Sequence, residues 1–442
     1  MTARAIFFSR LRGACPGLST PMPTGDGLLV RMLPIGTIAL EDFGTLCVAA
    51  REHGNGVIEI TARGSIQVRG LSAEAAPRFA DAIATLNIAA ADGIRVLSNA
   101  LAGLDCEEVF NADTLAADLR CALAQASLGT RLAPKVSVVI DGGGALTLDG
   151  LAADVRLRAE QANGQIALRI GIGGDGTNSV PLGIVRPADG VEAAVRMLDV
   201  IAQHGRDARA RNILATEGPD VFRAALADLV PTPARPRAGG DREIASRLRE
   251  STQKVEAIGT HRLRDGSLAC GIGLAFGHAD ATAMENLADA AKAAGASGIR
   301  TAPGRVLIIV GVARHTVPSF VAAAERLGFI DRADDPRRRV IACAGAPVCT
   351  FAHIATRTMA PGIAASVAPF LDAAFTIHLS GCTKGCAHPA PAALAVVGTA
   401  EGCALVAHGS ARDVPLTVVA TDELAAAITR YAREAIREHR HV

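Results

Sequence analysis

The chain has 442 residues, half of them apolar, and its 45 basic side chains nearly balance 44 acidic ones, for a net charge of +1. This length predicts two or more domains, or one large multi-lobed body with a sizeable core. A net charge near zero argues against a general nucleic-acid or membrane-surface role, so local basic residues would have to meet any anionic ligand. No apolar run reaches the ~18 residues of a membrane span, and residues 1–16 show no secretory signal, so we expect a cytoplasmic protein.

The first predicted segment, residues 13–88, has the pattern of a small α+β half-domain. A strand opens at Asp26-Gly-Leu-Leu-Val, and a helical stretch follows at residues 40–53. Residues 56–70 are strand-like, and residues 73–86 are helical again. Strand, helix, strand pair and helix are typical of a ferredoxin-like unit.

Residues 251–330 repeat this pattern at a distance of about 240 residues. Asp265-Gly-Ser-Leu-Ala opens the second copy, which continues through residues 281–294, 298–311 and 316–327. The repeat extends into two larger lobes, residues 89–229 and 331–442, because residues 95–106 correspond to 339–349 and residues 136–144 to 376–386. Residues 230–250 are expected to be a linker, since repeated prolines exclude a helix or a central strand.

A glycine motif in the first lobe is set aside as a dinucleotide site. Gly171-Ile-Gly-Gly-Asp-Gly176 follows a predicted strand at residues 165–170 and satisfies G-x-G-x-x-G. That fingerprint must open a helix, but the residues after it contain Pro181 and lack a helical period. We therefore expect a glycine-rich loop there, and electrons for any redox reaction would come from a separate protein.

Four cysteines carry the strongest chemical signal of the chain. Five residues separate Cys343 from Cys349, and three separate Cys382 from Cys386. Two close pairs of thiolates on separate Gly-, Ala- and Pro-rich loops suit a cubane iron-sulfur cluster, which needs one ligand for each iron. Structural zinc is the main alternative, although a five-residue gap fits it poorly. Disulfides are disfavoured because the other cysteines are scattered: Cys15, Cys47, Cys106, Cys121, Cys270 and Cys403.

The duplicated half-domain and the two cysteine pairs resemble the siroheme-dependent sulfite and nitrite reductase superfamily, from about residue 13 to about residue 424. The resemblance implies an α+β fold of two ferredoxin-like half-domains and two larger α/β lobes, related by a pseudo-twofold axis. It also implies that Cys343, Cys349, Cys382 and Cys386 bind a 4Fe-4S cluster, close to a central tetrapyrrole with eight carboxylates.

By the same resemblance, basic residues of the first copy bind the carboxylates of the macrocycle. Arg63 matches one of the arginines of the superfamily, and Arg69 would share its strand face because their separation is even. Arg95 and Lys135 match another arginine and an active-site lysine, and arginine can grip a carboxylate with two charge-assisted hydrogen bonds. Ser137 stands where the sulfite reductases have a second lysine, which weakens the assignment as a reductase.

Residues 12–31 and 380–389 are more similar to one branch of this superfamily, whose substrate is itself the macrocycle. The branch oxidises precorrin-3A with O2 in aerobic cobalamin biosynthesis, hydroxylating C20 and closing a lactone from the ring A acetate. A 4Fe-4S cluster, a mononuclear non-haem iron and an external electron donor, an NADH-linked reductase or a ferredoxin, are associated with that activity. The resemblance implies a catalytic role for Lys135. His388 is a catalytic candidate and the first candidate iron ligand because it follows Cys386 by two residues, and His378 and His353 of the same lobe are further candidates.

Two alternatives stay open from the sequence. A siroheme-dependent nitrite or sulfite reductase would bind the macrocycle permanently, with Cys386 as the thiolate shared between cluster and siroheme. A non-catalytic electron carrier would explain the cysteines but gives no reason for Arg63, Arg69, Arg95 and Lys135. We expect a monomer that binds neither nucleic acid nor membrane.

Overall fold

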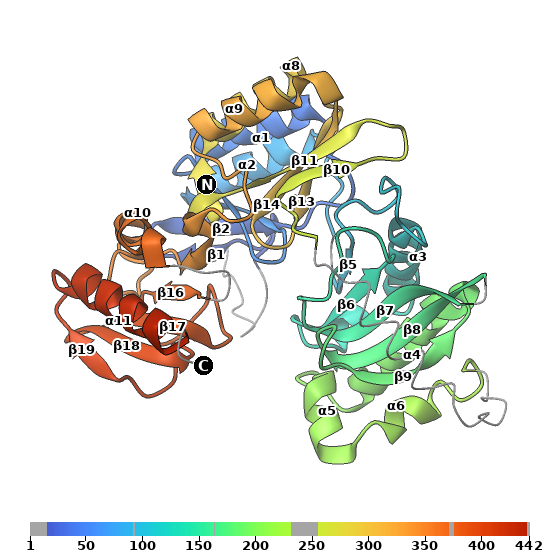
Figure 1. Ribbon diagram of the computed structural model, residues 1–442. Helices are drawn as coiled ribbons and strands as arrows, with labels where there is room; N and C mark the ends of the chain where they lie inside the picture. Colours follow the sequence, from blue (N-terminus) through green and yellow to red (C-terminus); the bar gives the residue numbers. More distant parts are fainter. Residues whose placement is uncertain (1–15, 92, 163, 231–254, 371–374, 440–442) are drawn as a thin grey trace, which may run out of the picture. The chain divides into compact units, whose positions relative to one another are not determined.

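The computed structural model describes residues 16–439 except for residues 92, 163, 231–254 and 371–374 (Figure 1). The chain divides into two compact units. One comprises, in its described part, Leu33–Thr37 and Ala89–Ala269, and the other Pro16–Met32, Ile38–Ile88 and Cys270–Val442. The predicted linker at residues 230–250 lies outside the described residues except for Val230, as do residues 1–15. None of the described helices is long and apolar enough to cross a membrane.

The two half-domains have the same strand order, which confirms the internal repeat. The sheets run β1-β2-β4-β3 and β10-β11-β14-β13, and the boundary between the two units falls inside β11. The elements of the first half-domain are β1 (Met22–Thr24), β2 (Gly27–Met32), α1 (Leu40–His53), β3 (Val57–Ile60), β4 (Ile66–Leu71) and α2 (Ala75–Ala84). Those of the second are β10 (Gly259–Arg262), β11 (Leu268–Gly273), β12 (His278–Asp280), α8 (Ala281–Ala293), β13 (Gly298–Ala302), β14 (Val306–Val312) and α9 (Val317–Arg326).

The strand-like residues 56–70, expected to supply the strand pair of the half-domain, form a hairpin of β3 and β4. Arg63 lies in the turn between the two strands, where Gly64 adopts a φ of +79°, a conformation that glycine reaches without steric cost. The even spacing therefore does not put Arg63 and Arg69 on one strand face. That expectation was wrong because a tight turn falls between them.

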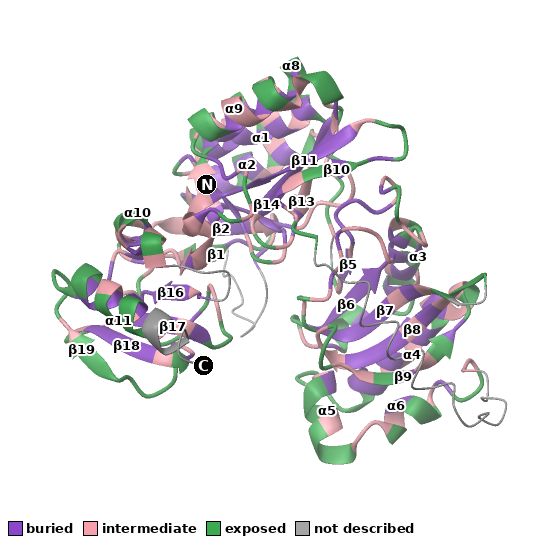
Figure 2. Ribbon diagram, viewed as in Figure 1, coloured by how far each residue is buried: buried purple, intermediate pink, exposed green. Residues whose placement is uncertain are grey.

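A single hydrophobic core joins the two half-domains. Helix α1 packs against α8, and buried side chains of α1 recur at intervals of three and four residues, as expected for a helix with one buried face. Phe43 and Leu46 are fully buried together with Met284 and Leu287 of α8 (Figure 2). Strand β12 also pairs antiparallel with β3, so the second half-domain extends the sheet of the first.

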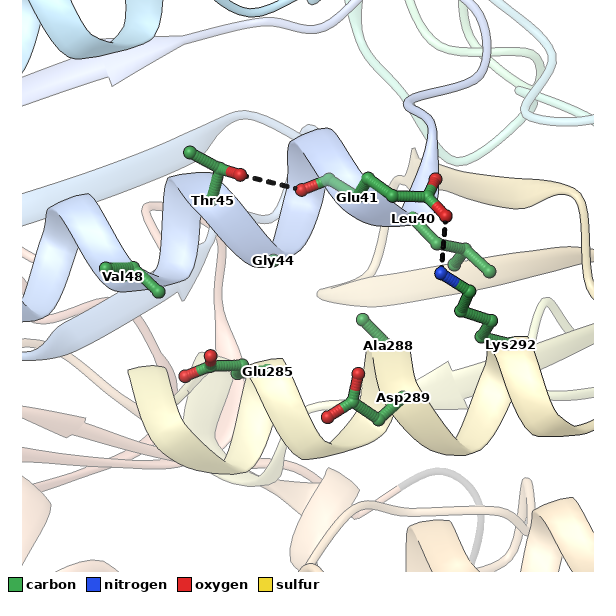
Figure 3. Close-up of a pocket in the computed structure, with 9 residues that line it drawn as sticks. All are labelled: Leu40, Glu41, Gly44, Thr45, Val48, Glu285, Ala288, Asp289 and Lys292. Atoms are coloured by element: carbon green, nitrogen blue, oxygen red, sulfur yellow. Dashed lines mark hydrogen bonds and ion pairs between the residues drawn. The ribbon is translucent and has the colours of Figure 1, made fainter.

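Charged side chains flank a small pocket between α1 and α8 (Figure 3). Lys292 lies 2.7 Å from Glu41, and Arg51 lies 2.7 Å from Glu285. Both pairs are exposed, so each contributes at most about 1 kcal/mol. The buried side chains, rather than these ion pairs, hold the two helices together.

The two larger lobes also share one topology. In each five-stranded sheet the first three strands are parallel and the last two pairs are antiparallel, in the orders β5-β6-β7-β8-β9 and β15-β16-β17-β18-β19. The first lobe consists of β5 (Arg95–Ser98), α3 (Ala112–Gln125), β6 (Ser137–Asp141), β7 (Ala153–Ala162), β8 (Gln165–Gly174), β9 (Val180–Val185), α4 (Gly190–Gln203), α5 (Ala210–Glu217) and α6 (Asp220–Ala224). The second consists of β15 (Val340–Ala342), α10 (Thr356–Val367), β16 (Ile377–Ser380), β17 (Ala392–Thr399), β18 (Gly402–Gly409), β19 (Thr417–Val419) and α11 (Leu424–His439).

The G-x-G-x-x-G motif lies in the hairpin between β8 and β9. Its first four residues belong to β8, and the next element is the strand β9, which contains Pro181. No helix begins at the motif, and a dinucleotide site of this type requires one. The motif thus opens no helix, as expected, but most of it lies in a strand and only Asp175 and Gly176 lie in the loop.

We expect Phe43→Ala to lower the free energy of unfolding by about 3–5 kcal/mol, because the ring is fully buried in the core that the half-domains share. Glu52→Ala on the same helix is the matched control, because Glu52 is exposed and should change stability by less than about 0.5 kcal/mol. Urea denaturation followed by circular dichroism measures both. If both variants lowered the free energy of unfolding by the same small amount, the burial of Phe43 between the helices would be contradicted.

Candidate functional site

The sheet topology of the second lobe brings the two cysteine pairs to one edge. Strands β15 and β16 are parallel neighbours, so their carboxyl ends lie side by side. Cys343 follows β15 directly, and Cys382 follows β16 after Gly381. The backbone N–H of Cys343 donates to the carbonyl of Leu379 at 3.1 Å. Residues about forty positions apart in the chain thus enter one site.

Hydrogen bonds tie the two cysteine loops to each other. The N–H of Gly381 donates to Sγ of Cys343 at 3.1 Å, and the N–H of His353 donates to the carbonyl of Gly381 at 2.8 Å. The hydroxyl of Thr356, which is fully buried, donates to the carbonyl of Cys343 at 2.7 Å. Backbone N–H groups directed at sulfur stabilise a thiolate and are part of how proteins hold metal-bound cysteines.

Gly381 is required by packing. A Cβ at this position would lie 2.6 Å from Cβ of Ala352, which is closer than two carbon atoms can approach. Any side chain here would push the Cys382 loop away from the Cys343 loop. The glycine therefore permits the N–H to sulfur contact.

The four thiols act on one another electrostatically. Burial raises the pKa of Cys386, and Cys382, Cys343 and Cys349 raise it further. All four can be thiolates together only if positive charge is supplied among them, and bound metal does this. Within the described ranges, no three His, Cys, Asp or Glu side chains are grouped so as to hold a metal ion. The sulfur ligands of a cubane cluster lie farther apart than the ligands of a single ion, because each thiolate binds a different iron.

Two histidines lie together beneath the Cys382–Cys386 loop. His378, in β16, is fully buried, and neither of its ring nitrogens has a hydrogen-bond partner among the described residues. Its ring makes an edge-on contact with that of His388, with 5.7 Å between centroids. Burial, with His388 and Arg305, lowers the pKa of His378 to about 4, so the ring is neutral at pH 7. The other candidate, His353, is exposed.

Arg69 belongs to a buried ionic network in the first half-domain. Its Nε donates to Glu59 at 2.9 Å, and its Nη1 lies 3.3 Å from Asp26. Glu59 also accepts from Arg357 of α10 at 2.5 Å and from Gln67 at 2.5 Å. Burial opposes the ionisation of Glu59, but Arg357 and Arg69 outweigh it and hold the pKa of the carboxyl below its ordinary value. A ligand carboxylate at Arg69 would therefore compete with Glu59 and Asp26.

Arg95 and Lys135 lie in the other unit, at the amino ends of two neighbouring strands. Arg95 begins β5 and is paired in register with Ser137, the first residue of the parallel strand β6. Lys135 precedes β6 by two residues and is exposed. The structure thus brings Arg95, Lys135 and Ser137 to one edge of the first-lobe sheet. The cysteines, His378, His388, Arg63 and Arg69 all belong to the second unit.

The sequence pattern alone missed Glu59, Arg305 and Arg357. Arg357 joins the helix after the first cysteine pair to β3, and Arg305 donates to the carbonyl of Ala387 at 3.1 Å. A charged residue inside the apolar run Val-Ile-Glu-Ile was the available signal for Glu59, since a buried carboxylate needs a cationic partner. No local pattern indicates which arginine that partner is.

Known proteins with a similar fold or sequence identify first the fold of this chain and then its family. A model of the nitrite/sulfite reductase ferredoxin-like half domain matches residues 20–86. The solved structure of Mycobacterium tuberculosis NirA superposes with a TM-score of 0.73 at 20% identity, covering 93% of this chain and 83% of that one. A ferredoxin–nitrite reductase of Synechococcus elongatus is 23% identical over 86% of this chain and 77% of its own length. The chain thus has the fold of the nitrite and sulfite reductases.

A precorrin-3B synthase from a Sinorhizobium species is 36% identical to the chain, over 96% of this chain and 89% of its own length. The chain belongs to the precorrin-3B synthase family. The nitrite reductase is more distant at similar coverage, which favours this branch of the superfamily over the reductases.

We expect Glu59→Gln to destabilise the protein by about 3–5 kcal/mol at pH 7, because it removes the carboxylate that Arg69 and Arg357 share and leaves Arg69 only its longer contact with Asp26. The folded-state pKa of Glu59 is depressed, so its contribution is complete above the unfolded carboxyl pKa of about 4.3 and is lost as pH falls through the folded value. The difference in free energy of unfolding between wild type and variant, measured by urea denaturation, should therefore become smaller between pH 7 and pH 3.5. The exposed Glu401→Gln is the control; a pH-independent difference would contradict the assignment.

Proposed function

We propose that this chain catalyses the O2-dependent conversion of precorrin-3A to precorrin-3B in aerobic cobalamin biosynthesis. In this reaction C20 of the macrocycle is hydroxylated and the ring A acetate closes a lactone. The observation that carries the proposal is the 36% identity to a precorrin-3B synthase over nearly the full length of both chains. The convergence of two cysteine pairs at the β15–β16 edge supports a redox function for that site.

Cys343, Cys349, Cys382 and Cys386 would hold a 4Fe-4S cluster, and His378 and His388 are the candidate protein ligands of a mononuclear non-haem iron. When bound, such groups supply single-electron transfer and dioxygen activation. The site fits a cluster in three respects: the Gly381 N–H is directed at sulfur, the other three thiols raise the pKa of Cys386, and the close approach of the two loops leaves no room for a Cβ at Gly381. The unpartnered ring nitrogens of His378 fit a bound group.

Basic side chains would bind the carboxylates of the substrate. Arg63 in the β3–β4 turn, Arg69, Arg95 and Lys135 can each make charge-assisted hydrogen bonds to them. Lys135 would also place positive charge and a proton at the reacting oxygen, while His388 would exchange a proton near C20. Arg63, Arg95 and Lys135 are assigned from their match to the superfamily pattern, Arg69 because it lies near Arg63 in the same hairpin, and His388 because it follows Cys386 by two residues.

The remaining partners follow from the reaction. Electrons would come from an NADH-linked reductase or a ferredoxin, since the glycine motif of the first lobe opens no helix. A monomeric protein acting in the cytoplasm fits the near-neutral charge of the chain.

A siroheme-dependent nitrite or sulfite reductase is the second candidate, and the similarity to the Synechococcus nitrite reductase favours it. There Cys386 would be the thiolate shared with siroheme. A visible absorption spectrum of the protein purified without oxygen, with acid-acetone extraction of any tetrapyrrole, separates the two. An iron-sulfur shoulder without extractable macrocycle supports the synthase, whereas siroheme bands support the reductase.

Cys382→Ser and Cys386→Ser should each abolish the iron-sulfur absorbance and precorrin-3A oxidation together, because each removes one of four cluster ligands. Iron and sulfide content per chain, measured beside turnover, checks this. Cys121→Ser is the control, since Cys121 is an exposed thiol on α3. A variant that keeps full activity without the cluster absorbance would refute the assignment.

Arg63→Ala should weaken precorrin-3A binding by about ten- to a hundredfold, the value of one charge-assisted hydrogen bond, while the cluster spectrum stays unchanged. Anaerobic titration of the macrocycle absorbance measures the affinity. Arg326→Ala, an exposed arginine on α9 of the second half-domain, is the matched control. An affinity equal to that of the control would remove Arg63 from the site.

A further inference from the structure

Arg305 lies in the turn between β13 and β14 and has a strained backbone conformation. Its φ is +67°, and that of the neighbouring Phe276 is +57°, both in the left-handed region that non-glycine residues seldom adopt. The carbonyl of Arg305 accepts from the N–H of Leu274 at 3.0 Å. Conformations of this kind persist where the surrounding structure enforces them, and they gather at functional sites.

The side chain of Arg305 reaches the loop that carries Cys386. It passes over Gly277, where a Cβ would lie 2.7 Å from Cδ of Arg305, so a side chain there would displace the arginine. Its Nη2 then donates to the carbonyl of Ala387, the residue after Cys386, at 3.1 Å. A guanidinium from the second half-domain is thus held against the cluster lobe within the same unit.

The guanidinium lacks a counter-ion in the described part of the chain. It makes no ion pair with a described carboxylate, and burial alone lowers its pKa. Arg305 is only partly exposed, and removing a cation from water without a compensating negative charge is costly, so an anion is expected beside it.

The cysteine loops supply such an anion once iron is bound. Four thiolates outweigh the positive charge of a cubane core, so the assembled cluster is an anion. The other cation of these loops, Lys384, is exposed and lies over the ring of Phe351, 3.0 Å from its centroid. Water screens Lys384, whereas Arg305 acts through the protein interior, where Coulomb interactions are stronger.

We propose that Arg305 is the counter-ion of the cluster held by Cys343, Cys349, Cys382 and Cys386, and that its charge raises the reduction potential of that cluster. The inference rests on the cluster assigned under the proposed function. One electron passes from the external donor to the cluster, no covalent bond changes, and the guanidinium keeps its proton. Arg305 is thus a positioning residue that makes the acceptance of that electron more favourable.

The test compares Arg305→Met, Arg305→Lys and Lys384→Met in anaerobic redox titrations without substrate, with the reduced cluster detected by electron paramagnetic resonance. Arg305→Met should disfavour one-electron reduction about tenfold, a shift of about 59 mV to lower potential. Arg305→Lys should keep a potential close to wild type because it keeps the charge. Lys384→Met should shift the potential less, and raised salt should remove its effect but leave that of Arg305→Met.

An unchanged potential in Arg305→Met, or equal shifts in the Met and Lys variants, would overturn the proposal. Weaker precorrin-3A binding by Arg305→Met at an unchanged potential would instead make Arg305 a substrate-carboxylate ligand. If Arg305→Met assembles no cluster, a wild-type potential in Arg305→Lys supports the counter-ion role and a shifted one opposes it. Wild-type protein without iron and sulfide would mean that the cluster assignment itself has failed, which iron analysis detects before any titration.

Discussion

The parallel pairing of β15 with β16 is the constraint on which the candidate site depends. Parallel neighbours end at the same edge of a sheet, so the residues after Ala342 and after Ser380 must meet there. The N–H of Gly381 is consequently directed at Sγ of Cys343, and the N–H of Cys343 at the carbonyl of Leu379. Neither cysteine pair could form the site alone, because each loop supplies only two thiols.

The first lobe shows what the same edge becomes without the cysteines. There β5 and β6 are also parallel neighbours, and their loops are tied by polar side chains. Asn99 accepts from the N–H of Gly142 at 2.6 Å, Asp105 from the N–H of Ala145 at 2.7 Å, and Asp141 from the N–H of Leu148 at 2.7 Å. The two equivalent edges thus differ: hydrogen bonds within the loops close one, and the other carries four thiols, the proposed cluster ligands.

Much of the architecture could be predicted from the sequence because its signals are local. The helix predicted at residues 40–53 is α1, and the second copy was recognisable from the order of its elements. The strand pair within residues 56–70 was expected, but its turn at Gly64 was not located, so Arg63 was wrongly placed on one strand face with Arg69. The cysteine pairs could be recognised from the number of residues between their members. The partners of Glu59 were not, since Arg357 lies about three hundred residues away and only the fold brings it near.

Two arginines link the half-domains to the cluster lobe, and they differ in one respect. Arg357 reaches from α10 of the lobe to the first half-domain, where Glu59 neutralises it. Arg305 reaches from the second half-domain to the lobe and finds a carbonyl, without a carboxylate from the described residues. If the arginine only stabilised the fold, a paired arginine such as Arg357 would be expected, because removing an ion pair from water costs less free energy than removing a single charge. The second arrangement becomes favourable when the anion arrives with the metal, so electrostatic complementarity on that side would be completed by cluster assembly.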